Sequence, residues 1–417
     1  MFKKYSCGLD IGSSKIAAAV AVLAGKKIVD IFFESQDIRG VRYGSVIDSA
    51  EVVESIGRVL KNLKAKSGVP IKAVYTNISG QDISTKHSTA IIPLAERGNK
   101  LVSTLDMEKV IDQAFVLGST IDEEVIHQIP VGYSVDAQSG ISNPLGLYAH
   151  KLAVDLYLIS AKLSMIQTVT YAVHQAGYEV REVFFSGLAT SDVVFDASLA
   201  HGTNILIDMG FDITEVLVFR DGVVREILLL HMGGSDLTRE LAERMSVPYE
   251  LAAELKISHG PVDEPLALDE RKEVLVRKEG EVVAIRHKDV ADILNAKTKS
   301  LCLLLKDVLE KTVPLADIRH CIFTGRTILQ EGFLEMVEAH LGIPVEFARV
   351  RDPQIASAVA GNSALSGRKY LTYLTALGLI CKRLEGFGPK TPDGKHPPVH
   401  PLKKAVHKLT EIYQEYF

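Results

Sequence analysis

The sequence predicts an α/β protein made of two similar halves, each built around a sheet with helices on both faces. One observation is a strand–turn–strand motif that occurs twice: residues 7–15 read C-G-L-D-I-G-S-S-K, and residues 206–214 read L-I-D-M-G-F-D-I-T. The other is that helix, strand and helix follow each copy in a similar order. Sheets of this kind bind ligands at the carboxyl ends of their strands. A generic α/β protein without duplication is the simpler alternative.

Composition narrows the class of protein. The chain has 417 residues, 47% of them hydrophobic and 24% charged, which is typical of a globular protein with a large core. The net charge of −5 argues against a nucleic-acid partner. Of the four cysteines, Cys7 and Cys321 lie in apolar strand-like runs, so we expect buried, reduced thiols. We expect no metal-binding cysteine motif, no membrane span and no signal peptide, and therefore a cytoplasmic protein.

The first half begins with three strands, a helix and a fourth strand. The helix carries apolar residues at helical spacing, from Val52 and Ile56 to Val59 and Leu63. A different unit follows over residues 84–160, with a helix that we expect to start at Thr104 or Asp106. In order, we expect strands at 6–11, 15–23 and 28–35, a helix at 49–67, a strand at 73–78, a strand near 85–93, a helix at 105–117, strands at 126–136 and 151–160, a helix at 163–176, a strand at 179–185 and a helix at 188–195.

The second half repeats the three strands, and Asp221-Gly222 forms the hairpin turn between two of them. A strand-rich insertion near residues 270–287 separates two helical stretches. In order, we expect strands at 205–209, 215–220 and 223–230, helices at 236–244 and 290–309, a strand at 320–323, a helix at 330–341 and a last short strand near 345.

The two Asp-x-Gly turns carry the chemistry. Glycine at a bend between strands lets backbone N–H groups approach a phosphate closely. A neighbouring aspartate can hold Mg²⁺ through water, so Asp10 and Asp208 are candidate metal and catalytic residues. One such turn is weak evidence, but two facing turns would enclose the phosphate tail of a nucleotide.

Several further segments resemble FtsA, the actin-like family of bacterial cell division proteins. Residues 10–15, D-I-G-S-S-K, resemble its first phosphate motif, and Y-T-N-I-S-G at 75–80 resembles its strand ending in I-S-G. The segments I-H-Q-I-P at 126–130 and N-P-L-G-L at 143–147 are similar to the family's inserted subdomain. The similarity extends over most of the first 380 residues. Other actin-like proteins lack the inserted unit, so those two segments are the more specific matches.

The resemblance implies an actin-like fold of duplicated ribonuclease-H-type domains. The first half would be residues 1–83 and 161–200 with an FtsA-type α+β insertion at 84–160, and the second half 201–234 and 306–384 with an insertion at 235–305. It also implies bound ATP and Mg²⁺, filament formation with copies of itself, and tethering of FtsZ filaments to the cytoplasmic face of the membrane at the division site, together with other divisome proteins. The implied nucleotide contacts are Gly12, Ser13, Ser14, Lys15, Gly210, Thr214, Gly234, Lys256, Gly325 and Arg326.

Three motifs depart from the family pattern. Phe211 and Asp212 replace glycines of the second phosphate motif, and Arg326 replaces a glycine of the adenosine motif. Asp212 would repel a phosphate unless it points away or holds the cation, whereas Arg326 could stack on adenine, pair with a phosphate or fill space. Glu254 is displaced by one position, while Lys256 keeps its place. We therefore expect slow hydrolysis at most, because phosphoryl transfer depends on positioning.

The C-terminal segment predicts a membrane-targeting helix on a linker. Residues 385–401 are rich in Gly and Pro, and one apolar stripe follows at Leu402, Val406, Leu409, Tyr413 and Phe417. Such a helix suits a membrane interface, although docking on the protein's own body is the alternative. The resemblance favours the membrane.

The FtsZ C-terminal peptide is expected on the second insertion, where basic residues could contact an acidic peptide: Arg239, Arg244, Lys288, Lys297 and Lys299. Two other functions stay open on the same fold. One is a scaffold like PilM of type IV pilus assembly, and the other is a small-molecule kinase.

Overall fold

A computed structural model describes residues 4–25, 27–96, 98–259, 273–278, 281–360, 362, 365 and 367–385. The chain divides into two compact units. The larger unit comprises residues 1–85, 120–127 and 159–381, and the described core of the smaller one comprises residues 86–119 and 128–158. The predicted tail helix lies outside the described residues.

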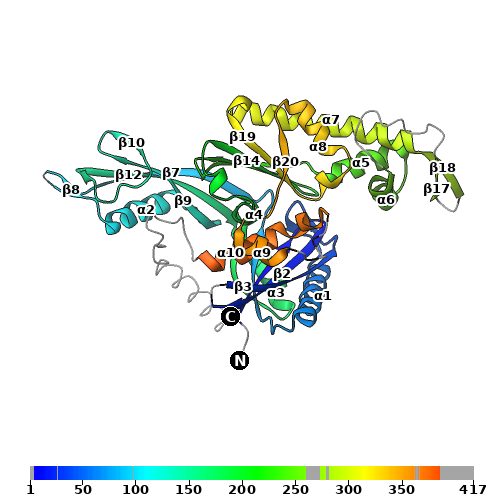
Figure 1. Ribbon diagram of the computed structural model, residues 1–417, viewed down its shortest axis with the longest axis horizontal. Coiled ribbons are helices and arrows are strands. Elements are labelled where there is room, and N and C mark those ends of the chain that lie inside the picture. Colours follow the sequence, from blue (N-terminus) through cyan, green and yellow to red (C-terminus); the bar gives the residue numbers. More distant parts are fainter. Residues whose placement is uncertain are drawn as a thin grey trace. The chain divides into compact units, whose positions relative to one another are not determined.

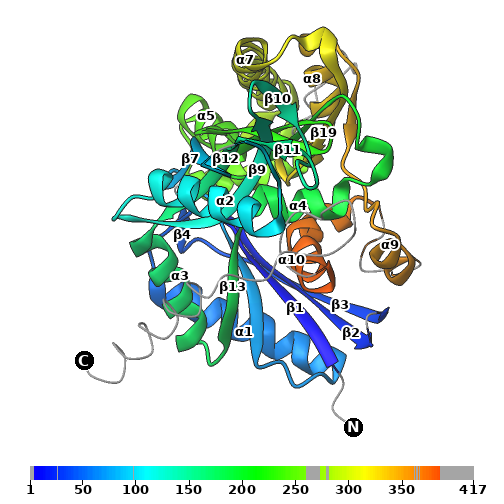
Figure 2. The ribbon, with the colours of Figure 1, turned by 90° about the vertical axis from the view of Figure 1, so that its left-hand side faces the viewer.

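The first half of the larger unit contains a five-stranded sheet of order β13-β6-β1-β2-β3. Three strands form an antiparallel meander, and two more continue the sheet in parallel with β1. Helices α1 and α10 lie on either side of this sheet (Figures 1 and 2). The elements are β1 (Lys4–Ile11), β2 (Lys15–Ala24), β3 (Lys27–Asp37), β4 (Val41–Arg42), β5 (Ser45–Val46), α1 (Ser49–Ser67), β6 (Ala73–Ile78), α3 (Leu163–Gln175), β13 (Glu179–Phe185), α4 (Ser186–Val194) and α10 (Leu374–Glu385).

The second half repeats this sheet in the order β16-β15-β14-β19-β20. Again three antiparallel strands are followed by two parallel ones, so the predicted duplication is confirmed. Asp221 and Gly222 have φ angles of 51° and 76°, the left-handed pair that a two-residue type I′ hairpin turn requires. The strands are β14 (Thr203–Met209), β15 (Thr214–Arg220), β16 (Val223–Leu230), β19 (Ile318–Thr324) and β20 (Val345–Phe347).

Helices and one hairpin complete the second half. Helices α5, α6 and α7 pack on one another, and α8 packs on α7 (Figure 1). The sequence did not predict α6 or α9, because neither shows a clear apolar period. The elements are α5 (Gly234–Met245), α6 (Tyr249–His259), β17 (Glu273–Lys278), β18 (Glu281–Arg286), α7 (His287–Thr312), α8 (Phe333–Leu341) and α9 (Pro353–Val359).

The smaller unit holds most of a four-stranded sheet of order β10-β9-β12-β7, a two-stranded ribbon and helix α2. Helix α2 is capped by Ser103, not by Thr104 or Asp106 as we expected. Asp106 is the third helical residue and returns a hydrogen bond to the backbone N–H of Ser103 in a capping box. The elements are β7 (Ile83–Pro93), β8 (Lys100–Leu101), α2 (Thr104–Gly118), β9 (Glu123–Val135), β10 (Gln138–Ile141), β11 (Tyr148–Ala149) and β12 (Lys151–Lys162).

The core confirms two expectations from composition. The strands next to the two turns are buried along nearly their whole length, as fully covered strands should be. All four cysteines are buried and unpaired. Among the described residues, the helices are too short or too polar to cross a membrane.

Candidate functional site

The two predicted phosphate turns have the same backbone geometry. In the first, the N–H of Gly12 donates to the carbonyl of Lys15 at 2.9 Å, and in the second the N–H of Gly210 donates to the carbonyl of Ile213 at 3.0 Å. Each turn joins a buried strand that ends in aspartate to the next strand of the meander. The same local sequence pattern therefore accompanies the same hairpin in both halves.

Asp10 is held by neighbours from two elements, β2 and β6. Its carboxylate accepts from Lys15 Nζ at 2.5 Å and from Asn77 Nδ2 at 2.7 Å. Lys15 Nζ also donates to the carbonyl of Thr372 at 2.7 Å, and Asn77 Nδ2 donates to Ser186 Oγ at 2.8 Å. Asn77, at the end of the parallel strand β6, is a site residue that the sequence analysis did not single out.

Asp208, the matching aspartate of the second half, lies in the field of Asp10. Burial, and then the negative charge of Asp10, raise its pKa to about 6, although Lys15 opposes the shift. The two aspartates are therefore close enough to interact, as the duplicated turns predicted. A cation between them would relieve this repulsion.

Glu215 adds a third carboxyl group that the sequence analysis missed. It is buried, and its register partner across the β14–β15 hairpin is Asp208. Ser79 of the first half donates its hydroxyl to the Glu215 carboxyl group. Burial, and then the charge of Asp208, raise the pKa of Glu215 to about 8, so the group is largely protonated at neutral pH. A charged residue inside an otherwise apolar strand was the available signal.

Asp212 points away from the second phosphate turn. Its side chain is buried, and one carboxylate oxygen accepts from the backbone N–H of Tyr43 at 3.0 Å. It therefore connects the second half to the segment between β4 and β5 of the first half. Phe211 instead lies near Lys256, whose Nζ is 5.9 Å from the centre of its ring.

The other predicted contacts gather around the start of α5. Lys256 Nζ donates to the carbonyl of Gly234 and to Thr238 Oγ1, each at 2.8 Å. Burial, and then the positive charge of Arg326, lower the pKa of Lys256 to about 8. Thr214 is fully buried and donates its hydroxyl to the carbonyl of Met232 at 2.8 Å. The hydroxyl proton of Thr214 is thus already engaged within its own half.

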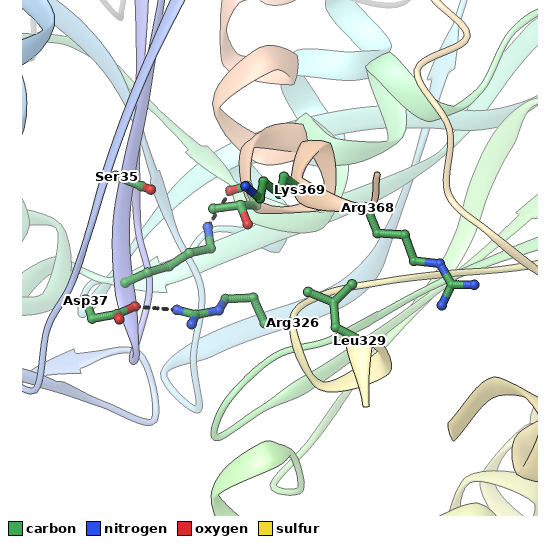
Figure 3. A pocket seen from close by; sticks show the side chains of 8 residues that line it. Ser35, Asp37, Arg326, Leu329, Arg368 and Lys369 are labelled. Carbon is green, nitrogen blue, oxygen red and sulfur yellow. Dashed lines mark hydrogen bonds and ion pairs between the residues drawn. The ribbon is translucent and has the colours of Figure 1, made fainter. Parts of the chain in front are cut away.

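Gly325 needs its glycine. Its φ angle is 98°, and a Cβ there would lie 2.7 Å from the Asp208 carboxylate and overlap the carbonyl of Met209. The next residue, Arg326, extends from the end of β19 to the first half, where its Nη1 lies 2.5 Å from Asp37 Oδ1 (Figure 3).

This ion pair lies in a cavity of about 420 Å³ that contains Lys15 of the first phosphate turn. The described residues bring no group of three or more potential metal ligands together. A magnesium ion here would have Asp10 and Asp208 as protein ligands and would need oxygens from water or phosphate for the rest.

The duplicated sheets with facing Asp-x-Gly turns define an actin-like protein. Two solved structures share the fold. The PilM–PilN type IV pilus biogenesis complex gives a TM-score of 0.63 at 16% identity, covering 91% of this chain and 99% of that one. The ethanolamine utilization protein EutJ from Carboxydothermus hydrogenoformans gives 0.52 at 13% identity, covering 91% and 90%.

Sequence comparison identifies the family. A model described as the SHS2 domain inserted in FTSA matches residues 80–160, and one described as cell division protein FtsA matches residues 205–360. The FtsA of Pseudomonas aeruginosa is 25% identical over 355 residues, covering 82% of each chain. The FtsA of Streptococcus pneumoniae is 25% identical over 378 residues, covering 89% of this chain and 82% of that protein. The chain belongs to the FtsA family of cell division proteins.

Proposed function

We propose that this protein binds ATP with Mg²⁺ between its two halves and acts as a polymerising adaptor that holds FtsZ filaments at the membrane. The two matched turns, with Asp10 and Asp208 facing each other, carry this proposal. Lys15 lies beside Asp10, and half of the residues that line the adjoining cavity are cationic. The residues present therefore fit a polyphosphate chain and its cation.

Each residue has a distinct part in this proposal. Ser13 and Ser14 would offer backbone N–H groups to the phosphates from one side, and Lys15 would supply a cation beside them. Gly12 and Gly210, whose own N–H groups close the two turns, would let the phosphates approach the backbone closely. Asp10 and Asp208 would orient Mg²⁺, which neutralises phosphate charge when bound. Gly234, Lys256 and Gly325 would line the nucleoside side, Arg326 would lie beside them in the cavity that contains Lys15, and Thr214 would support the second turn through its bond to Met232.

Turnover by this site should be slow. Asp208 ionises only above its raised pKa of about 6, and Asp10 shares its charge with Lys15. The buried Glu215 is largely neutral, so it is poorly suited to bind a cation on the side of the second half. For the same reason it does not repel phosphate. The nucleotide in this proposal regulates assembly, and its hydrolysis is a secondary event.

The FtsZ peptide would bind beside α5 and α7. Arg244 and Lys297 come from these two helices and both contact Glu240, at 2.6 and 3.3 Å. Their side chains thus form one small cluster that an acidic peptide could share. Arg239 is turned elsewhere, because it pairs with Asp236 and contacts the hydroxyl of Tyr43.

The membrane contact would come from the tail at residues 402–417, with self-assembly providing many tails on one filament. In this proposal the protein lies at the cytoplasmic face of the membrane at the division site, with further divisome proteins as partners.

Two measurements test the proposal. ATP affinity with Mg²⁺ should fall at least tenfold in Asp10→Ala and stay unchanged in the matched surface variant Asp30→Asn. The full chain should co-sediment with FtsZ and vesicles of anionic lipid, whereas a chain that lacks residues 402–417 should not. ATP binding that is unaffected by Asp10→Ala would refute the site, and phosphate transfer to a sugar would favour the kinase alternative.

A further inference from the structure

The cavity beside Lys15 has the chemistry of an anion site. Its eight lining residues comprise four cations and a single carboxylate, and none of them is aromatic: Lys15, Ser35, Asp37, Arg326, Leu329, Arg368, Lys369 and Thr372. Figure 3 shows Arg326 reaching toward Asp37 beside Leu329, with Lys369 on the neighbouring helical turn. Such a lining offers a purine base no aromatic ring to stack on, whereas phosphate oxygens would find several donors.

The cations of this cavity differ in how firmly they are held. Lys15 is fixed by Asp10 and by the carbonyl of Thr372. Arg368 lies 3.8 Å from the centre of the Phe347 ring. Arg326 is held by Asp37, whose side chain is 79% exposed while that of Arg326 is 39% exposed. An ion pair this open to water contributes little free energy, so an anion with more oxygens can displace Asp37.

The charge of Arg326 also influences a lysine outside the cavity lining. It acts on Lys256, where it is the second cause of a lowered pKa. Arg326 and the partly buried Lys256 therefore repel each other, and the partner of Arg326 is the exposed carboxylate of Asp37. A phosphate placed beside Arg326 would reduce this repulsion.

We propose that Arg326 is a phosphate-binding residue of the nucleotide site and that Asp37 is a resident counter-ion which the incoming phosphate displaces. This inference rests on the proposed nucleotide binding. Arg326 stands at a position where the FtsA family usually has glycine. In this proposal it gains a contact with phosphate, and this contact compensates for the glycines lost from the second turn. It also makes the bridge between β3 and β19 dependent on the nucleotide, since Arg326 releases Asp37 when phosphate binds.

The proposal predicts effects of opposite sign at the two residues. Arg326→Gln removes the charge but keeps much of the side chain, and should weaken ATP binding about tenfold, which corresponds to about 1.4 kcal/mol. Asp37→Asn removes the competing carboxylate and should tighten ATP binding about threefold, the range of a surface ion pair. Arg326→Lys should lie between the parent and Arg326→Gln.

The experiment is calorimetric titration of the full-length protein at fixed ionic strength with ATP–Mg²⁺, inorganic tripolyphosphate and adenosine. Two controls are matched: Asp30→Asn removes another exposed carboxylate of β3, and Arg58→Gln removes an exposed arginine that pairs with Glu54 on α1. Both should bind ATP like the parent. Unchanged melting temperatures of the Arg326 and Asp37 variants exclude unfolding as the cause.

The ligands separate the possible outcomes. Equal losses for ATP and tripolyphosphate in Arg326→Gln support a phosphate contact, whereas a loss seen only with adenosine would show a base contact and overturn the proposal. Tighter ATP binding by Arg326→Gln would show that the arginine merely fills the cavity. If the parent binds ATP and neither variant changes its affinity, the inference fails while the nucleotide site stands. If the parent binds neither ATP nor tripolyphosphate, the proposed function itself fails.

Discussion

Removing the Asp212 carboxylate should destabilise the contact between the two halves. Its oxygen accepts the N–H of Tyr43, which has a φ angle of 48° and begins a left-handed turn with Gly44 at 80°. A Cβ on Gly44 would overlap the carbonyl of Ser79, so this turn is packed against the first half on its other side. Asp212 thereby fixes a strained turn that its own half does not contain.

The magnitude follows from burial. Asp212 is only 4% exposed, and hydrogen bonds to charged groups contribute about 1.5–3 kcal/mol. Asp212→Ala should therefore lower the free energy of unfolding by about 2 kcal/mol, which in a protein of this size is a decrease in melting temperature of roughly 2 °C. Asp212→Asn keeps an acceptor oxygen and should cost under about 1 kcal/mol.

Differential scanning calorimetry of the two variants beside the parent gives the answer. Equal stability of Asp212→Ala and the parent would show that the Tyr43 contact contributes nothing.

Substitutions at position 212 also test the effect of the Asp212 carboxylate on ATP binding. The sequence predicted that glycine at both 211 and 212 raises ATP binding or turnover, but the position of the carboxylate assigns any gain to Phe211→Gly alone. A gain from Asp212→Gly would mean that the carboxylate does repel phosphate.

Three further predictions concern the pH dependence of stability, the binding of the protein to membranes and its binding to the FtsZ peptide. The pKa of Glu215 is raised from 4.5 to about 8, so between these pH values the folded state keeps the proton of Glu215 while the unfolded state loses it. The free energy of unfolding should therefore fall as pH rises from about 4.5 to 8, by up to about 1.4 kcal/mol per pH unit. Glu215→Gln should flatten this part of the unfolding profile, and an unchanged profile would contradict the assignment. Deleting residues 402–417, or Leu409→Glu, should release the protein from anionic vesicles without lowering its melting temperature. A large drop in melting temperature with binding retained would place the helix on the protein's own body. Charge reversal at Arg244 and Lys297 should weaken FtsZ-peptide binding about tenfold by fluorescence anisotropy, and unchanged affinity removes both residues from that surface.

The sequence by itself determined most of the elements and their duplication. Helix α1 was predicted at its observed limits from its apolar spacing, and the structure shows Asp48 capping its start and Gly68, at φ 63°, ending it. The two Asp-x-Gly turns and the Asp221-Gly222 hairpin were likewise readable, since each depends on a few neighbouring residues. Apolar runs bounded by these turns then sufficed to order the strands within each half.

Only the tertiary structure decided which residues of one half meet the other. Asp212 bonds to Tyr43 across 169 positions of sequence, and Arg326 pairs with Asp37 across 289. Both substitutions looked like losses of phosphate-binding glycine when considered alone. The spacing of apolar residues predicts which face of a helix or strand is buried, but not which element packs against it. The direction in which Asp212 and Arg326 point depends on how the two sheets pack together. The pKa of Glu215 has the same origin: the pairing of β14 with β15 places Asp208 opposite it, and the fold buries it and adds the charge of Asp10 from the other half.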